Sequence, residues 1–350
     1  MIFTSDNASG VAPEILDAVA RVSGGYTRGY GADETSERVE DMVREVFEAP
    51  SARAFTVATG TAANALALAC LCPPWAAIYC HDVSHIEADE CGAPEFFTGG
   101  ARLTLLDGDH AKMRPAEIER AVSGAAPLGV HNVQAGAISI TQATERGAAY
   151  TLDEIAAFGG TARRNGVGLH MDGTRFANAV ARAGCSPAEM SWKAGVDVLC
   201  LGATKNGALA AETVILFDPE RAWEFELRRK RSGHLFSKMR FVSAQVEAYL
   251  TDDLWLRLAR HSNAMADRLA AGIAGIEGAE VMNPVEANML FVSMRLDQHR
   301  RLRAAGAMYY SENFELDENG PDGGPWEARL VTSFQTTEAD VDRFLEVMAG

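Results

Sequence analysis

The chain has 350 residues, of which 47% are hydrophobic, so it can bury a large core and form two or three domains. Its formal net charge at pH 7 is -16. So acidic a surface repels nucleic-acid phosphates and anionic lipid heads, which argues against a nucleic acid or a membrane as the main partner.

The beginning of the chain and its cysteines bear on location. The first residues, "MIFTSDNASGVAPEIL", lack a basic segment and a long apolar run, so we expect no secretory signal. No apolar stretch elsewhere approaches the length that spans a bilayer. The cysteines are irregularly spaced and are expected to be reduced thiols. Cys70 and Cys72 form a poor metal pair because no second pair follows them, so we predict no metal site and a cytoplasmic location.

Most of the chain alternates between helical and strand patterns. In 34–49, apolar residues such as Val39 and Val43 recur at helical spacing, and Thr35 or Ser36 can cap the start. The next expected elements are a strand at 52–60, a helix at 61–71, strands at 76–80 and 99–106, a helix at 114–122, a strand at 136–141, a helix at 151–166, a strand at 167–172, a helix at 174–184 and a strand at 196–201.

This alternation predicts the fold class. Short apolar strands separated by helices of about ten to fifteen residues indicate an α/β fold, with a mostly parallel central sheet covered by helices on both faces. In such sheets the catalytic groups gather at the C-terminal ends of the strands.

From residue 254 the pattern changes. A long helical segment carries Leu258, Ser262, Met265, Leu269 and Ile273 on one face. It is followed by a strand at 288–294, a helix near 297–305, a Gly/Pro-rich loop at 317–325, a strand at 328–333 and a last helix. We therefore predict a large domain at 1–253, which includes the N-terminal segment, and a smaller α+β domain at 254–350.

Gly60 and Thr61 follow a predicted strand and open a predicted helix. Backbone N–H groups, a hydroxyl and the helix dipole at such a turn suit a phosphate, although many turns of this kind are merely tight connections. No GxGxxG follows a strand and no GxxxxGK[ST] occurs, so neither a dinucleotide site nor an NTPase loop is supported.

Asp172 ends a predicted apolar strand, and Arg175 lies three residues further on. A buried carboxylate is costly unless it meets a cation, and a protonated pyridine nitrogen is one such partner. The simpler alternative is a helix N-cap with a nearby Arg ion pair. A metal pair of His170 and Asp172 is a third possibility, but it lacks further ligands at recognisable spacing.

Lys205 follows the next predicted strand and is the only cation in the stretch "LGATKNGALAAE". A desolvated lysine has a lowered pKa, and its neutral amine can form a Schiff base with a carbonyl. A phosphate turn, a strand-end Asp and a strand-end Lys, in this order, are the parts needed to hold pyridoxal phosphate, which stabilises a carbanion at the Cα of an amino acid.

Several segments together resemble the low-specificity L-threonine aldolases, in the fold-type-I branch of pyridoxal-phosphate enzymes. They are "FTSDNASG", "GYGADETS", "TGTAANALAL", "SHIEADECGAPE", "HMDGTRFANA", "GATKNG" and "RLVTSF". The resemblance is to a bacterial subgroup acting on threonine and phenylserine. It implies an aspartate-aminotransferase-like fold, a pyridoxal 5'-phosphate cofactor and an amino acid substrate.

The resemblance also implies roles in catalysis. Lys205 would carry the cofactor as a Schiff base, and Asp172 would pair with the pyridine nitrogen. Arg175 would contact the phenolic oxygen of the cofactor and contribute to substrate binding. His85 would stack on the cofactor ring near the substrate hydroxyl, as a third catalytic residue.

Further roles concern the phosphate and the substrate carboxylate. Gly60 and Thr61 would hold the phosphate, while Ser5 and Arg329 would bind the carboxylate, to which an Arg offers a bidentate fork. Thr204 is a secondary candidate, either for the phosphate or for fixing the backbone of Lys205.

The basic run at 228–240 would ordinarily be a solvated helix face. In the family, a Lys or Arg of the corresponding segment reaches the phosphate in the neighbouring subunit, which makes Lys230 and Arg240 candidates. The resemblance thus implies active sites shared between subunits, in a homotetramer built as a dimer of dimers.

The chain departs from the family at one place. Many threonine aldolases have a second active-site His after the strand that matches 136–141, whereas this chain reads "TQATERGAAY" there, with Thr144 near the expected position. Gln142 or Thr144 could line the site instead. Because a Thr is a poor base, base duty would fall on His85 or on a bound water.

The resulting hypothesis is an aldolase that cleaves L-threonine, L-allo-threonine or phenylserine to glycine and an aldehyde. The first alternative keeps the cofactor but makes the protein a β-eliminating lyase or a racemase acting on another amino acid. The second alternative is a non-catalytic binding protein with the same fold, against which the full set of Asp172, Arg175 and Lys205 argues.

Overall fold

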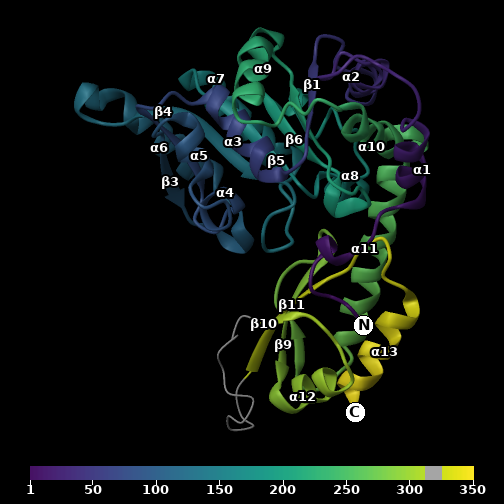
Figure 1. The fold of residues 1–350 in the computed structure, drawn as a ribbon. Coiled ribbons are helices and arrows are strands. Elements are labelled where there is room, and N and C mark those ends of the chain that lie inside the picture. Colours follow the sequence, from purple (N-terminus) through teal and green to yellow (C-terminus); the bar gives the residue numbers. More distant parts are fainter. Residues whose placement is uncertain (312–324) are drawn as a thin grey trace.

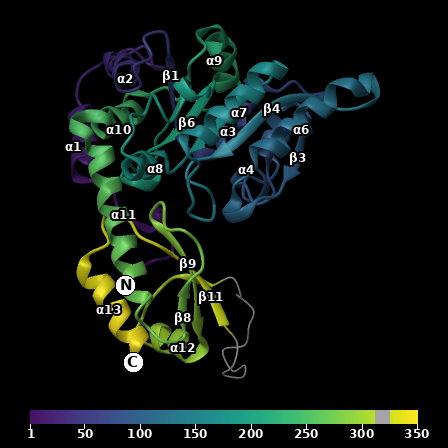
Figure 2. The same cartoon turned by 180° about the vertical axis from the view of Figure 1, so that it is seen from behind.

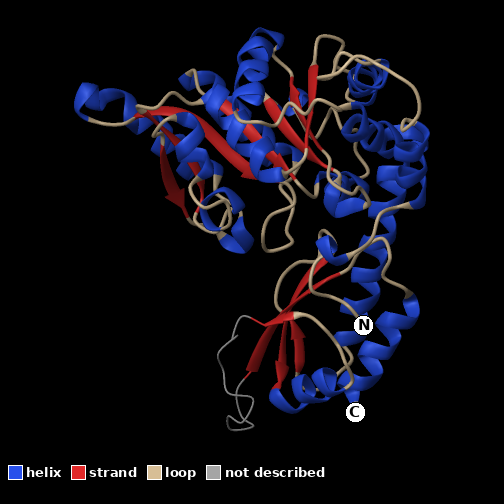
Figure 3. Cartoon of the chain, viewed as in Figure 1, coloured by secondary structure: helices blue, strands red, loops and turns tan. Residues whose placement is uncertain are grey.

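The computed structural model describes residues 1–311 and 325–350, which form two sheets with helices packed around them (Figures 1 and 3). In the described part of the chain, no helix combines the length and the apolar character needed to cross a membrane. The predicted loop at 317–325 lies outside the described residues, except for Pro325, which begins a strand.

The larger sheet has seven strands in the order β1-β7-β6-β5-β4-β2-β3. Their bounds are β1 Arg53–Val57, β2 Ala76–His81, β3 Arg102–Leu106, β4 Gln134–Thr141, β5 Gly168–Gly173, β6 Val198–Gly202 and β7 Glu212–Leu216. Neighbouring strands from β6 to β3 run parallel, and only β7 runs antiparallel to its two neighbours. The predicted mostly parallel α/β sheet is confirmed.

Helices cover both faces of this sheet because its strands are apolar on both sides. In β6, Leu199 and Leu201 point into one core, while Val198 and Cys200 point into another. The first core receives α1 Pro13–Arg21, α2 Glu34–Val46, α6 Pro115–Ala125, α7 Leu152–Asn165, α8 Phe176–Ala183 and α10 Arg240–Leu250. The second receives α3 Gly60–Leu71, the short α4 His85–Ala88 and α9 Ala222–Arg231, and α5 Ala93–Thr98 packs against α3.

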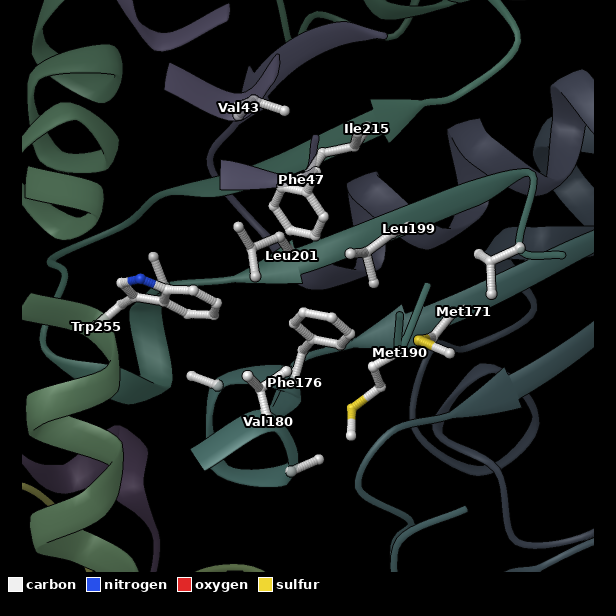
Figure 4. Close-up of a cluster of buried hydrophobic side chains, with 14 of the residues drawn as sticks. Val43, Phe47, Met171, Phe176, Val180, Met190, Leu199, Leu201, Ile215 and Trp255 are labelled. Carbon is white, nitrogen blue, oxygen red and sulfur yellow. The ribbon is translucent and has the colours of Figure 1, made fainter. Parts of the chain in front are cut away.

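Aromatic side chains fill the centre of the first core (Figure 4). The ring centroids of Phe47 and Phe176 are 5.9 Å apart, and those of Phe176 and Trp255 are 6.4 Å apart. Trp255 belongs to α11, so this packing ties the long helix to the large sheet. Burial of such rings dominates core energetics and fixes where α8 lies beside the strand ends.

The second sheet has four antiparallel strands in the order β10-β11-β9-β8. Their bounds are β8 Ala279–Val281, β9 Met289–Arg295, β10 Tyr310–Ser311 and β11 Pro325–Val331, with α12 Leu296–Ala304 and α13 Glu338–Ala349 beside them. The helix α11, Leu254–Ile273, runs from the first core into the core of this sheet, as Figures 1 and 2 show. Phe3 also packs there, so the two termini lie in the same region.

Seven short 3-10 helices complete the secondary structure of the described chain. They are η1 Asp6–Ala8, η2 Asp109–Ala111, η3 Ala126–His131, η4 Trp192–Ala194, η5 Thr204–Asn206, η6 Pro219–Arg221 and η7 Thr251–Asp253. Two of them, η1 and η5, lie against each other, and the Ala12 N–H donates to the Gly207 carbonyl at 2.8 Å. The N-terminal segment therefore packs beside the turn that carries Lys205.

One sequence-based detail is wrong. The N-cap of α2 is Asp33, whose side chain accepts from the Ser36 N–H at 3.0 Å, and neither Thr35 nor Ser36 caps the helix. Asp33 is preferred because its carboxylate both satisfies a free N–H and favours the positive end of the helix dipole. Thr35 instead accepts a hydrogen bond from Arg38.

Candidate active site

The candidate site lies at the C-terminal ends of the parallel strands. Asp172 is the second-to-last residue of β5, and Lys205 is in η5, directly after β6. The ends of these strands approach closely, since a Cβ added at Gly202 would lie 2.6 Å from the carbonyl oxygen of Thr174. Glycine is therefore required where β6 passes the turn after Asp172, and this contact brings the two predicted residues to one edge of the sheet.

Asp172 is buried and fully hydrogen-bonded. Its Oδ1 accepts from the Thr174 N–H at 3.0 Å and from the Thr174 hydroxyl at 2.7 Å, and its Oδ2 accepts from Asn64 Nδ2 at 2.8 Å. Burial alone would raise the pKa of Asp172, but the charge of His85 and the Thr174 hydrogen bonds outweigh it and hold the pKa below its ordinary value. The group is an anion ready for a cationic partner.

Both simpler readings of this motif fail. The N-cap of α8 is Arg175 rather than Asp172, and Arg175 pairs with Asp6. His170 uses Nδ1 toward the Ser139 hydroxyl at 2.9 Å and Nε2 toward Cys200 Sγ at 3.3 Å. Because both ring nitrogens are already engaged in the core, His170 is not half of a metal pair, and burial lowers its pKa to about 4.

His85 begins α4 and faces the same edge of the sheet. Its Nδ1 lies 2.8 Å from Oε1 of the buried Glu90, and this hydrogen bond raises the pKa of His85. Asn64 Nδ2 donates to the same Glu90 oxygen at 2.9 Å as well as to Asp172. Burial raises the pKa of Glu90 despite these bonds. A single amide therefore links the His85 pair to Asp172.

One ligand atom each of His85, Glu90 and Asp172 lies within 4.8 Å of the others, which is close enough for a metal ion. The amide nitrogen of Asn64 already donates to both carboxylates, and the Glu90 oxygen also bonds to the imidazole. The carboxylates of Glu90 and Asp172 are thus already acceptors in a hydrogen-bonded network. In this arrangement they are better suited to positioning a ring cation than to holding a metal.

Lys205 is held in a turn that the surrounding backbone fixes. The Thr204 hydroxyl donates to the Ala211 carbonyl at 3.3 Å and accepts from the Ala211 N–H at 3.1 Å, which closes the segment 204–211. Glu212 Oε2 accepts from the Ala203 N–H at 3.0 Å, and burial raises the pKa of Glu212 to about 7. Thr204 is thus bonded to backbone, as the role of fixing Lys205 requires.

The surroundings of Lys205 shift its amine toward the neutral form. Burial lowers the pKa of Lys205, and the positive charge of Arg175 lowers it further, whereas the carboxylates of Asp6 and Asp172 act in the opposite direction. The net pKa is below the ordinary value of a lysine. A neutral, desolvated amine is the form that attacks a carbonyl to give a Schiff base.

Arg175 is bound on one side by Asp6, from η1. Its Nε and Nη2 donate to the two oxygens of Asp6 at 2.9 Å and 3.0 Å, and Asn288 Nδ2 adds a bond of 3.1 Å to Asp6. Burial alone would raise the pKa of Asp6, but the charges of Arg175 and Lys205 outweigh it. Asp6 therefore fixes the guanidinium beside Lys205.

Arg329, on β11, approaches the site from the second sheet. Its Nη2 donates to the Thr4 carbonyl at 3.3 Å, and its Nε is buried without a hydrogen-bond partner. Burial and the nearby charge of Arg175 lower the pKa of Arg329. Ser5 lies next to this contact and N-caps η1, where its hydroxyl accepts from the Asn7 N–H at 3.2 Å. An unpartnered guanidinium nitrogen fits an anionic ligand.

A cavity of about 340 Å3 opens between the two sheets beside Arg329. Its walls come from the loops after β2 and β4 and from the strands β9, β10 and β11. The lining residues are Val83, Glu145, Arg146, Phe291, Tyr310, Ser311 and Arg329. This volume is sufficient for a small organic side chain and adjoins the predicted carboxylate site.

Gly60 and Thr61 form the first turn of α3, as predicted. The N-cap is Thr59, whose hydroxyl accepts from the Ala62 N–H at 3.2 Å. The N–H groups of Gly60 and Thr61 have no partner within the helix, because the first turn of any α-helix leaves its donors free. With the helix dipole they can bind a phosphate.

The structure does not bring Lys230 and Arg240 to the Lys205 turn of the same chain. Lys230 is exposed on α9, where its amine lies 4.5 Å from the centre of the Tyr30 ring. Arg240 starts α10 and donates to the carbonyls of Gly24 and Gly25, both at 3.4 Å. Both predicted residues thus lie on a surface built from the segments 24–30 and 230–240.

The two residues expected near the missing second His point away from the site. Thr144 is buried, with its hydroxyl donating to the His110 carbonyl at 2.8 Å. Gln142 is also buried and bonds through both ends of its amide to the backbone of Tyr150, at 3.0 Å and 2.9 Å. Neither side chain is available to a substrate hydroxyl.

Sequence reasoning missed several residues of the site, chiefly Asp6, Asn64, Glu90 and Glu145. Asn64 is the one strongly polar side chain in the interior of α3, which is otherwise made of small and apolar residues and is buried throughout. A buried amide in such a helix is a signal that could have been used, since it must find polar partners. The others depend on contacts between distant loops.

Comparisons with known proteins identify the family of the chain. The family described as beta-eliminating lyase matches residues 3–296. The low specificity L-threonine aldolase of Pseudomonas aeruginosa is 42% identical over 99% of this chain and 95% of its own length, and that of a Pseudomonas species is 41% identical over 97% and 94%. The structure of the Leishmania major threonine aldolase matches with a TM-score of 0.91 at 28% identity, over 99% and 98% of the two chains.

The fold, with its small second sheet, is that of fold-type-I pyridoxal-phosphate enzymes, and the relatives favour an aldolase over a β-eliminating lyase or a racemase. The chain therefore belongs to the beta-eliminating lyase family, among its threonine aldolases, which are pyridoxal-phosphate-dependent lyases.

Proposed function

We propose that the protein cleaves the Cα–Cβ bond of L-threonine, L-allo-threonine and phenylserine, to give glycine and the corresponding aldehyde. The observation that carries this proposal is the pair formed by a buried, deprotonated Asp172 and a Lys205 of lowered pKa at adjacent strand ends. An acidic partner for a ring nitrogen and a neutral amine are the two groups that pyridoxal phosphate requires.

The residues present fit the cofactor. Asp172 is a buried carboxylate with only neutral hydrogen-bond donors on its two oxygens, so a protonated ring nitrogen would supply a direct cationic partner. Gly60 and Thr61 would hold the phosphate at the start of α3, Lys205 would hold the aldehyde carbon, and His85 would cover the ring. When bound, the cofactor supplies an electron sink for the carbanion at Cα.

The other residues bind and orient the substrate. Arg329 and Ser5 would hold its carboxylate, since Arg329 Nε is buried without a partner. Arg175, fixed by Asp6, would direct its remaining nitrogen toward the phenolic oxygen of the cofactor and the substrate. Burial lowers the pKa of Lys205, so its amine gives up and takes up a proton more readily, and in its protonated form it can donate the proton that Cα needs to give glycine.

Absorbance spectroscopy with a Lys205→Ala variant tests this assignment. The purified protein with pyridoxal phosphate should show the visible band of a protonated Schiff base, and the variant should lose that band together with at least ~10³-fold in the rate of aldehyde release. Lys193→Ala is the control, because Lys193 forms an exposed ion pair with Glu48. An unchanged band in Lys205→Ala would overturn the assignment.

We infer that two copies share each active site, within a homotetramer, and that Lys230 or Arg240 reaches the partner's phosphate. Tyr26 is fully exposed and Tyr30 and Phe236 are partly exposed on the same surface, which supports burial against another copy. Mixing Lys205→Ala subunits with subunits that carry both Lys230→Ala and Arg240→Ala should restore part of the activity that each variant lacks. No recovery in mixed oligomers verified by light scattering would contradict sharing.

We also propose a division into domains at 1–253 and 254–350 and a cytoplasmic location. The boundary is supported by the long helix α11, which starts at Leu254. The first residues, Ile2 and Phe3, nevertheless pair with Met308 and Val331 of the smaller part. The six cysteines are free thiols, as is usual in reducing compartments. Limited proteolysis and cell fractionation test the two points.

A further inference from the structure

We propose that Glu145 is the base that accepts the proton of the substrate's β-hydroxyl group, in the place where many relatives of this family use a second His. The inference rests on the proposed function. It assigns a catalytic role to a residue in the loop after β4, next to the two side chains, Gln142 and Thr144, that turn into the core.

Glu145 is held so that one of its carboxylate oxygens accepts hydrogen bonds and the other accepts none. Its Oε1 accepts from the Thr141 hydroxyl at 2.8 Å and from the His85 N–H at 2.9 Å. Its Oε2 is buried and has no hydrogen-bond partner. Leaving a buried carboxylate oxygen unsatisfied costs free energy, which is typical of a group that awaits a ligand. A carboxylate fixed at one oxygen is a preorganised acceptor at the other.

The position of Glu145 relates it to the predicted substrate. Glu145 and Arg329 line the same cavity, and Arg329 also carries an unpartnered buried nitrogen. An amino acid whose carboxylate is bound by Arg329 has its Cβ only two bonds away from that carboxylate. Its hydroxyl and side chain would therefore extend into the cavity that Glu145 lines, beside His85.

The charged groups around Glu145 determine its protonation. Burial raises the pKa of Glu145 to about 6, although the hydrogen bonds from Thr141 and the His85 N–H act in the opposite direction, and the charge of Asp172 raises it further. Other titratable or charged groups that face it from the neighbouring elements are His85, Cys80, Tyr150, Arg146, Tyr310 and Arg329. At neutral pH the carboxylate is deprotonated and yet basic enough to take a proton.

His85 is a weaker candidate for the same duty. Its Nδ1 is already engaged by Glu90 at 2.8 Å, and this hydrogen bond raises the pKa of His85, which favours the protonated imidazole. Its geometry suits a donor that covers the cofactor. The two residues are adjacent, because the His85 N–H donates to Glu145, so both can face one substrate.

The step balances without a further reactant. The proton of the β-hydroxyl moves to Glu145 Oε2, the carbon–oxygen double bond of the aldehyde forms at Cβ, and the Cα–Cβ bond breaks with its electron pair left on Cα. Cα then takes a proton to give glycine, and Glu145 loses its proton to water after the aldehyde leaves.

Glu145→Gln tests the proposal by separating two reactions of the same holoenzyme. Exchange of the glycine α-proton with D2O, followed by NMR, needs the cofactor and Lys205 but has no β-hydroxyl to deprotonate. The variant should lose about 100-fold or more in kcat for aldehyde release from threonine, the usual effect of removing a general base, and keep glycine exchange within about threefold. The acid limb of the kcat/KM profile, near pH 6 in the parent, should also disappear.

Glu286→Gln is the matched control. Glu286 accepts from the Ala149 N–H at 2.7 Å, so this variant loosens the same loop without touching the cavity, and both reactions should stay near the parent values. Glu145→Asp is the second variant, in case the amide disturbs folding or cofactor absorbance. It keeps the charge but shortens its reach, so cleavage should fall about tenfold with exchange preserved.

Three outcomes would overturn the role of Glu145: cleavage within about threefold of the parent in Glu145→Gln, equal losses of cleavage and exchange in both Glu145 variants, or equal losses in Glu286→Gln. The proposed function fails separately, if the parent protein releases no glycine and aldehyde.

Discussion

Asp172 and Arg329, on opposite sides of the candidate site, differ in how completely they are hydrogen-bonded. On the side of the seven-stranded sheet, Asp172 has three hydrogen bonds, and one amide joins it to the His85–Glu90 pair. On the side of the four-stranded sheet, Arg329 has one bond of 3.3 Å and an unpartnered Nε beside an open cavity. Asp172 therefore has its hydrogen-bond partners before any ligand binds, whereas Arg329 keeps a nitrogen that a ligand can use.

This difference indicates a division of labour. The cofactor is the same in every turnover, so a rigid, pre-bonded set of partners at the strand ends is suited to it. The amino acid arrives and leaves in each cycle, and unsatisfied groups that it can bind provide affinity without competing internal bonds. Substitutions on the two sides should therefore affect different kinetic constants.

The largest effect is expected on the pre-bonded side. Asp172→Asn removes the negative charge but keeps the size of the side chain, so kcat for threonine cleavage should fall by about 10²-fold or more, because charge stabilisation at the cofactor is lost. The visible absorbance band should shift toward the unprotonated form. Steady-state kinetics and a pH titration of that band measure both effects. A kcat within twofold of the parent would contradict the role of Asp172. The control is Asp197→Asn, because Asp197 lies in the loop before β6 and does not bond to Asp172, Asn64 or Glu90.

A moderate effect is expected at Arg329. Arg329→Ala removes a charged partner of the substrate carboxylate, a contribution of about 1.5–3 kcal/mol, so KM for threonine should rise roughly 10- to 150-fold with a smaller change in kcat. Arg343→Ala, on the exposed face of α13, is the control. A fall in kcat at unchanged KM would mean that Arg329 does not bind the ground-state substrate and would remove the contrast between the two sides.

The smallest effect is expected in the cavity wall. Phe291→Leu keeps most of the buried volume of β9 but removes an aromatic surface from the cavity. The kcat/KM for phenylserine should fall roughly tenfold while that for threonine changes less than about threefold, since small differences in a hydrophobic pocket are worth 1–3 kcal/mol. Competition between the two substrates measures the ratio. Equal changes for both would indicate that the cavity does not receive the side chain.

The sequence was sufficient for the groups that follow regular elements. Lys205, Asp172 and the Gly60–Thr61 turn could be placed together because parallel strands end at one edge of a sheet, and their alternation with helices was visible as periodicity. The smaller sheet was also predicted, since its strands and long helix have clear apolar patterns. These inferences use local patterns and a general rule of topology.

The residues that were missed depend on how irregular segments fold. Glu145 is one residue from Thr144, yet its side chain faces the cavity while that of Thr144 faces His110. The opposite directions follow from the conformation of the loop after β4, which no periodicity encodes. Asp6 likewise meets Arg175 only because η1 packs against η5, a contact between residues far apart in the sequence.

Product analysis tests the central claim most directly. The purified holoenzyme is incubated with L-threonine or phenylserine, and all products are quantified by NMR and by an ammonia assay. We expect equimolar glycine and acetaldehyde, or glycine and benzaldehyde, with no ammonia. Ammonia and a keto acid without glycine would contradict an aldolase and support a β-eliminating lyase on the same fold.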